Sequence, residues 1–246
     1  MDTAYPHPAP PLTLDRRDGP YGEVVLRRRG EVHEIIANGC FLMDSSDGRS
    51  ERLLVRAALA ELGERPDPTL LLGGLGVGFS LAEAAAEPRW ARLTTVEREP
   101  AIVEWHTAGD RPLAPVTAQA LADPRTELVV GDLVAYLRGD RLAGSGSWGE
   151  TAGGGTASPV FDVMALDIDN GPDWTVTEGN ADLYTPEGLA LCRERLAPGG
   201  VLAVWSARPS AAFETAMRNA GFDRVRTDEV QVARGVPDAV HFGRRA

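Results

Sequence analysis

A run of closely spaced glycines follows a short apolar segment in the first third of the chain. Residues 70–72 lead into Gly73-Gly74-Leu75-Gly76-Val77-Gly78, and residues 81–86 then have the composition of a helix. Because glycine has no Cβ, such a turn between a strand and a helix lets backbone N–H groups approach a ligand closely. The stretch is typical of a turn that binds a nucleotide-like molecule.

Acidic residues follow three other apolar segments of the chain. Glu97 lies 24 residues beyond Gly73 and ends the segment 93–96, Gly131-Asp132 follow 126–130, and Asp167 follows 161–166. A carboxylate in the place of Glu97 can accept both hydroxyls of a ribose. Ligands of open α/β sheets bind outside the carboxyl ends of the strands, so the three acids and the glycine run are predicted to surround one site.

Each of these features also has a purely structural explanation. The glycine run and Glu97 could be a tight turn and a surface glutamate, Asp132 could be a helix N-cap, and Asp167 could form a turn before Asn170-Gly171-Pro172.

Strand-like and helix-like segments alternate along most of the chain, which predicts an α/β fold. We expect a Rossmann-like, doubly wound, mostly parallel seven-stranded sheet within residues 49–246. A small N-terminal β hairpin or meander is expected at residues 22–48, and residues 1–21 are expected to be a flexible arm. Residues 139–159, rich in glycine and serine, are predicted to be a flexible surface insertion, with a lid as the alternative. The predicted strands of the large sheet are 70–72, 93–96, 126–130, 161–166, 201–205, 222–226 and 239–242, and a helix is predicted over 51–62.

Composition narrows the class of protein and partner. The 246 residues carry a formal charge of −11, which disfavours DNA or RNA as a partner and suits a small or cationic substrate, although an acidic surface can serve solubility alone. No apolar stretch approaches the roughly 20 residues that span a bilayer, and the N-terminus lacks the pattern of a signal peptide, so a cytoplasmic protein is expected. Cys40 and Cys192 have no metal-ligand spacing with any histidine, so we expect neither a disulfide nor a bound metal.

The order of motifs resembles that of class I S-adenosylmethionine-dependent transferases, and within them the spermidine synthase (polyamine aminopropyltransferase)-like branch. The resemblance rests on Leu-Leu-Gly-Gly-Leu-Gly-Val-Gly, Val-Glu97, Val-Val-Gly-Asp132, Phe-Asp-Val-Met-Ala-Leu-Asp167 and Leu-Ala-Pro-Gly-Gly, in that order. It covers roughly residues 22–242 and implies S-adenosylmethionine, or its decarboxylated form, as the cofactor.

The resemblance also implies roles for individual residues. Gly73, Gly74, Gly76 and Gly78 would surround the amino-acid or aminopropyl end of the cofactor, and Glu97 would bind the ribose. Gly131 and Asp132 would lie at the adenine, with Leu133 against the ring. Asp167 matches the first aspartate of the Asp-Ser-Ser-Asp loop of that branch and would be the base that deprotonates the attacking amine. Asp169, Asn170, Trp174 and Tyr184 follow on the same loop and could line an acceptor pocket, although a surface tyrosine and a core tryptophan are the simpler alternatives.

The sequence departs from that branch at several positions. Gly76 stands where the branch has an aspartate that suits the ammonium end of decarboxylated S-adenosylmethionine and would repel a carboxylate. The glutamine and tyrosine expected near Leu42 and Arg49 are missing, and Asp167-Ile168-Asp169-Asn170 replaces Asp-Ser-Ser-Asp. Residues 44–48, Asp-Ser-Ser-Asp-Gly, precede the first strand of the large sheet and are interpreted as a turn.

These departures lead us to expect methyl transfer to a small acceptor, for which an amine-bearing molecule is one candidate. The alternative within the same cofactor class is aminopropyl transfer from decarboxylated S-adenosylmethionine to a diamine. A non-catalytic nucleoside-binding protein is a further alternative, and NAD-dependent oxidoreduction is disfavoured because Gly-x-Gly-x-x-Gly spacing is absent. A homodimer is possible by the same resemblance.

Overall fold

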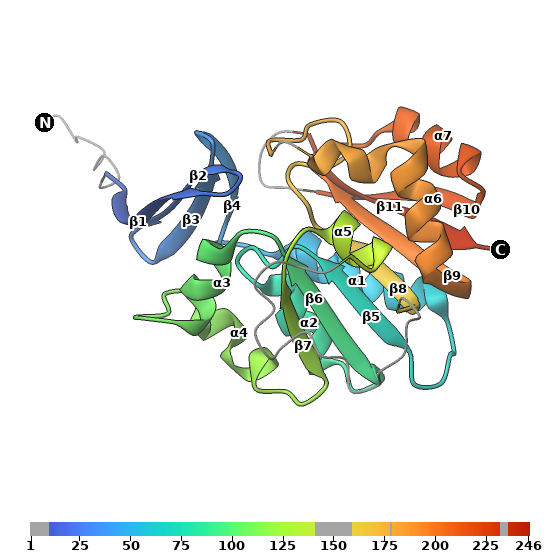
Figure 1. Cartoon of the computed structure of the whole chain (residues 1–246), viewed down its shortest axis with the longest axis horizontal. Helices are drawn as coiled ribbons and strands as arrows, with labels where there is room; N and C mark the ends of the chain where they lie inside the picture. Colours follow the sequence, from blue (N-terminus) through green and yellow to red (C-terminus); the bar gives the residue numbers. More distant parts are fainter. Residues whose placement is uncertain (1–9, 141–158, 178, 232–235) are drawn as a thin grey trace, which may run out of the picture.

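The computed structural model describes residues 10–140, 159–177, 179–231 and 236–246. A four-stranded antiparallel sheet precedes a larger seven-stranded sheet that has helices on both faces, which confirms the predicted α/β class (Figure 1).

The small sheet consists of β1 (Leu12–Gly19), β2 (Gly22–Arg29), β3 (Val32–Ala37) and β4 (Cys40–Asp44). The strands of the large sheet are β5 (Thr69–Gly73), β6 (Arg92–Glu97), β7 (Thr126–Val130), β8 (Phe161–Leu166), β9 (Leu196–Ser206), β10 (Phe222–Val230) and β11 (Asp238–Arg245). The helices are α1 (Arg49–Leu62), α2 (Phe79–Ala86), α3 (Pro100–Thr107), α4 (Ala114–Leu121), α5 (Leu133–Arg138), η1 (Asn180–Tyr184), α6 (Pro186–Arg195) and α7 (Ala211–Asn219).

The strand order of the large sheet explains where a ligand site forms. The order is β10-β11-β9-β8-β5-β6-β7, with β5 to β9 parallel and β11 and β10 antiparallel at one edge. The chain runs from β5 outward to β7 and then returns to β8 on the other side of β5. This reversal between β5 and β8 places the glycine turn after β5 beside Asp167 at the end of β8.

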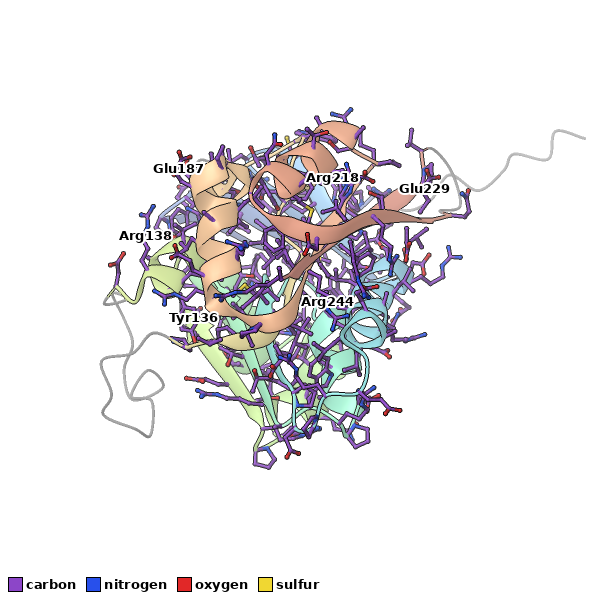
Figure 2. All side chains as sticks on the ribbon, turned by 90° about the vertical axis from the view of Figure 1, so that its right-hand side faces the viewer. Tyr136, Arg138, Glu187, Arg218, Glu229 and Arg244 are labelled. Atoms are coloured by element: carbon purple, nitrogen blue, oxygen red, sulfur yellow. The ribbon has the colours of Figure 1, made fainter. Side chains whose placement is uncertain are left out.

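Alternating side chains of the central strands divide the core into two layers. Leu70 and Leu72 of β5 face the layer shared with α1 to α4, whereas Leu71 faces the layer shared with α5, α6 and α7. A strand buried on both faces needs apolar residues at successive positions, which is why Leu70-Leu71-Leu72 is a continuous apolar run. Figure 2 shows the molecule with the right-hand side of Figure 1 toward the viewer, and the labelled Glu187, Arg218 and Glu229 lie on α6, α7 and β10.

The N-terminal sheet begins earlier than expected. Residues 12–19, predicted to be part of a flexible arm, form β1 and pair antiparallel with β2. The Trp105 indole of α3 donates a hydrogen bond of 2.9 Å to Asp15, and Arg17 forms an ion pair with Glu104. These contacts, which order β1, come from residues far away in the sequence. The composition of residues 12–19 alone therefore did not predict a strand.

Other segments also differ from the sequence-based boundaries. Strand β9 begins at Leu196, five residues before the predicted start at Val201, and includes the Pro198-Gly199-Gly200 segment. Helix α4 and η1 were not predicted. The predicted insertion at 139–159 lies almost entirely outside the described residues.

Candidate active site

A cavity of about 740 Å³ lies at the carboxyl ends of the parallel strands and extends to the N-terminal sheet. It contains ten carboxylate-bearing residues in its lining and two arginines, Arg49 and Arg98. Such an imbalance of charge attracts cationic ligands. The cavity is therefore the candidate site, and it lies where the fold rule placed it.

The glycine turn is held against the strand ends by specific backbone contacts. Gly74 N–H donates to the Val96 carbonyl at 2.9 Å, and the Asp167 N–H donates to the Gly73 carbonyl at 2.8 Å. Gly74 has a φ of +91°, and a Cβ there would lie 2.3 Å from the Asp167 carbonyl oxygen. Only glycine allows this close approach, which brings the turn and Asp167 into one wall of the cavity.

Glu97 is buried at the end of β6 and faces the same turn. One carboxylate oxygen accepts from Leu75 N–H and the other from Glu99 N–H, each at 2.8 Å. Burial raises the pKa of Glu97, and these backbone donors offset part of the rise. An ionised carboxylate offers about four acceptor positions, so Glu97 can still accept a further hydrogen bond besides those from Leu75, Gly76 and Glu99.

Met43 of β4 covers the glycine turn at Gly76. The Val77 N–H lies 3.3 Å from the Met43 sulfur, and a Cβ on Gly76 would lie 2.2 Å from that atom. The space for a side chain at position 76 is thus filled by a thioether from the N-terminal sheet. Gly76 removes the repulsion that an aspartate would exert on the carboxylate of S-adenosylmethionine, as predicted from the sequence, but the position is covered by Met43.

Three carboxyl groups from different elements converge near the turn. Glu51 comes from α1, Asp167 from the end of β8 and Asp238 from the start of β11, and all three line the cavity. Burial raises the pKa of each. Glu51, Asp238 and Glu97 add to the rise at Asp167, and Asp238 and Asp47 add to the rise at Glu51. The Ser50 hydroxyl donates to Glu51 at 3.1 Å and also hydrogen-bonds Asp238. Mutual repulsion of this kind is relieved by a bound cation.

Asp169 and Asn180 organise the loop after β8. The Asp169 carboxylate accepts from Val176 N–H, Thr177 N–H and the Asn180 side-chain amide at 3.0, 3.1 and 2.8 Å. Asn180 also accepts from Arg98, whose guanidinium lies 3.5 Å from the centre of the Tyr21 ring. Asp169 lines the cavity, and its oxygens hold this loop, which Asn180 and Arg98 connect to the N-terminal sheet.

Other predicted residues also lie on the cavity wall. These are Gly131, Asp132, Leu133, Asn170 and Trp174. Asp132 is in addition the N-cap of α5, with its carboxylate accepting from Ala135 N–H at 2.9 Å, so the structural explanation is correct and its contact with adenine stays a prediction. Trp174 is 53% exposed, not a core residue.

Gly73, Gly78 and Tyr184 are not in the cavity lining, in contrast to their predicted contacts. A Cβ on Gly73 would meet Leu133 and Leu166, and one on Gly78 would meet Thr117, so these two glycines serve packing of the turn. Tyr184 packs edge-on against Phe213 and donates its hydroxyl to the Ile168 carbonyl at 3.2 Å. Its aromatic ring therefore packs in the second core layer, while its hydroxyl contacts the loop after β8.

Sequence reasoning missed Glu51, Asp238 and Met43. Glu51 was taken only as the start of a helix, and Asp238 only as a residue before the last strand. Residues 44–48 do form the predicted turn, in which Ser46 N–H donates to Asp44 at 2.8 Å, yet Asp44 and Asp47 also line the cavity. No group of three or more His, Cys, Asp or Glu within the described residues has an arrangement that could hold a metal ion.

Comparison with known proteins places this geometry in context. No family model matches the chain. The chain is 30% identical over 194 residues to a polyamine aminopropyltransferase of Mycobacterium tuberculosis. The aligned residues make up 78% of this chain and 32% of that protein. It is 29% identical over 173 residues to polyamine aminopropyltransferase 2 of Pseudomonas aeruginosa. This alignment makes up 65% of the chain and 39% of that protein. The chain thus spans about a third of the length of the curated relatives it matches.

Solved structures show the same fold over nearly the whole chain. The spermidine synthase of Thermotoga maritima superposes with a TM-score of 0.69 at 15% identity, covering 96% of this chain and 73% of that one. A spermidine synthase in complex with the transition-state analogue AdoDATO gives a TM-score of 0.72 at 16% identity, covering 96% and 74%. No helix within the described ranges combines the length and apolar character needed to cross a bilayer. In sequence and in fold, the chain resembles the spermidine synthase branch of the class I S-adenosylmethionine-dependent transferases.

Proposed function

We propose that this protein transfers an aminopropyl group from decarboxylated S-adenosylmethionine to a small amine, with a diamine as the best-fitting acceptor. The observation that carries the proposal is the convergence of Glu51, Asp167 and Asp238 on the cavity that the glycine turn and Glu97 border. Decarboxylated S-adenosylmethionine has a sulfonium and an ammonium but no carboxylate, and a diamine adds two further ammonium groups. Both molecules relieve the repulsion among these acids.

Methyl transfer, which we placed first from the sequence, has less support. Its basis was the missing acid at Gly76, but Met43 fills that space and Glu51 and Asp238 supply negative charge from other elements. The carboxylate of S-adenosylmethionine would add to the repulsion in this cavity. The relatives found by sequence comparison are aminopropyltransferases, which also favours the alternative.

The described residues fit the donor molecule and the displacement. Glu97 would bind the ribose, the cavity wall at Asp132 and Leu133 would accommodate the adenine, and the turn at Gly74 would lie against the aminopropyl end. The acceptor nitrogen attacks the aminopropyl carbon attached to sulfur, the carbon–sulfur bond breaks, and its electron pair stays on sulfur to give neutral methylthioadenosine. Because the sulfonium is already a good leaving group, the protein needs chiefly to align the amine and remove its proton.

Asp167 is the proposed base for that proton. An attacking ammonium must first lose a proton, and a carboxylate with a raised pKa is better matched to accept it than one with an ordinary pKa. A diamine has a second ammonium several bonds from the attacking nitrogen. Ionised Glu51 and Asp238 would bind this second ammonium and so hold the attacking nitrogen close to Asp167.

The proposal is tested with purified protein, decarboxylated S-adenosylmethionine and a set of linear diamines and monoamines of equal chain length. Release of methylthioadenosine and the mass of the amine product are followed together. The proposal predicts an amine heavier by one aminopropyl unit, formed faster with diamines than with monoamines. Methylated amine formed from S-adenosylmethionine, with no product from the decarboxylated form, would overturn it.

A further inference from the structure

A buried histidine contacts the glycine turn from outside the cavity lining. His106 of α3 is 2% exposed. Its Nε2 lies 2.8 Å from the Gly76 carbonyl oxygen and its Nδ1 lies 2.8 Å from the Thr117 hydroxyl of α4. Neither His106 nor Thr117 is in the cavity lining.

The partners of the ring fix its protonation. A carbonyl oxygen can only accept a hydrogen bond, so Nε2 carries the proton that is donated to Gly76. Burial lowers the pKa of His106, against smaller opposing effects of the Gly76 and Leu113 carbonyls, and this favours a ring whose Nδ1 accepts from the Thr117 hydroxyl. The imidazole is therefore a hydrogen-bond donor of defined orientation at Nε2.

The hydrogen bond from His106 determines the orientation of the Gly76–Val77 peptide group in the turn. In a trans peptide the C=O and the following N–H point in opposite directions. With the Gly76 carbonyl directed at His106, the Val77 N–H is directed at Met43, which lines the cavity. Gly76 and Gly78 both have positive φ, at +50° and +98°, so the turn is built from residues that also allow other backbone conformations.

We propose that His106 is a positioning residue that holds the Gly76–Val77 peptide with its N–H toward the cavity and its carbonyl away from it. The inference rests on the proposed function in one respect, namely that the turn binds the aminopropyl end of the donor. Without the hydrogen bond from the imidazole, the Gly76–Val77 peptide is free to rotate. Its carbonyl oxygen can then face the bound aminopropyl donor or Met43. His106 thus acts on the donor only through Gly76.

The test compares His106→Leu with His106→Gln. Leucine removes the donor, whereas glutamine retains an amide N–H of similar reach. His241→Leu is the matched control, because His241 is also a fully buried histidine but lies in the layer next to Phe213, outside the cavity lining. Each variant is measured for hydrogen exchange of the 73–78 segment without ligand, and for KM of the donor, KM of the amine and kcat.

The expected result is specific to the turn. His106→Leu should speed exchange in residues 73–78 and raise the donor KM by about tenfold, with the amine KM unchanged, and His106→Gln should recover most of both effects. His241→Leu should lower thermal stability without changing the donor KM. A His106→Leu variant with unchanged exchange in the turn overturns the inference, and so does a uniform loss of kcat that glutamine does not rescue. Because the exchange measurement needs no ligand, it still decides whether His106 holds the turn if the proposed transfer reaction fails.

Discussion

Replacing Glu51 with glutamine should make the empty protein more stable and a diamine bind less tightly. Glu51 is 9% exposed and lies near Asp167 and Asp238. Two like charges about 6 Å apart repel by about 3 kcal/mol at an effective dielectric constant of about 20. Burial is the larger cause of the raised pKa of Glu51 and the neighbouring carboxylates add to it, so we expect about 1–2 kcal/mol of this repulsion at neutral pH.

The sign of the stability effect follows from the direction of the pKa shift. A carboxyl whose pKa is higher in the folded state than in the unfolded state lowers stability as the pH rises above its unfolded value. Glutamine cannot ionise, so the variant should unfold about 2–8 °C higher at pH 7 than the parent, since 1 kcal/mol corresponds to about 2–4 °C for a chain of this size. At pH 4 the two proteins should unfold at more similar temperatures.

The same substitution removes an attraction for the acceptor. The KM of a diamine should rise about 5- to 30-fold, which corresponds to the same 1–2 kcal/mol, while the KM of the donor changes less. Differential scanning calorimetry and initial-rate kinetics on one preparation measure both effects. A variant that is less stable at pH 7 and has an unchanged diamine KM would refute the view that these acids are held in mutual repulsion for a cation.

Further predictions concern the proposed base and the turn. Asp167→Asn should lower kcat by about 10²- to 10⁴-fold with a smaller change in donor KM, measured by methylthioadenosine release; a tenfold or smaller loss would remove Asp167 from the role of base. Because the pKa of Asp167 is raised, kcat/KM should fall as the pH drops through that raised value, and Glu51→Gln should shift this acidic limb to lower pH by removing a repelling charge; a shift to higher pH would contradict the coupling. Gly76→Asp should weaken donor binding in calorimetry because the new side chain meets Met43, and Met43→Ala should recover part of that loss; equal binding by Gly76→Asp and the parent would show that Met43 yields without cost.

Residues close together in the sequence could be predicted well. The run from Leu70 to Gly78 specifies a buried strand and a turn locally, and the rule for strand ends then brings Glu97, Asp132 and Asp167 to the same edge. These features depend on hydrophobic pattern and on the direction of parallel strands, both of which the sequence carries. The same reasoning identified the small N-terminal β unit and all seven strands of the large sheet.

Residues that reach the cavity from other elements could not be predicted in this way. Met43 meets Gly76 across 33 positions of the chain, and Asp238 meets Glu51 across 187, so only tertiary packing brings them together. Tyr184 shows the opposite error, because proximity in sequence to Asp167 suggested a shared pocket, whereas η1 directs its ring into the core. Strand β1 likewise depends on Trp105 and Glu104, which no local pattern of residues 12–19 indicates.

The most direct test of aminopropyl transfer is calorimetric titration of the purified protein with decarboxylated S-adenosylmethionine and, separately, with S-adenosylmethionine at one pH and salt concentration. The acid-lined cavity predicts tighter binding of the decarboxylated form, by about tenfold or more, because only the carboxylated form brings a negative charge to Glu51, Asp167 and Asp238. Tighter binding of S-adenosylmethionine would contradict the account and would restore methyl transfer as the leading function.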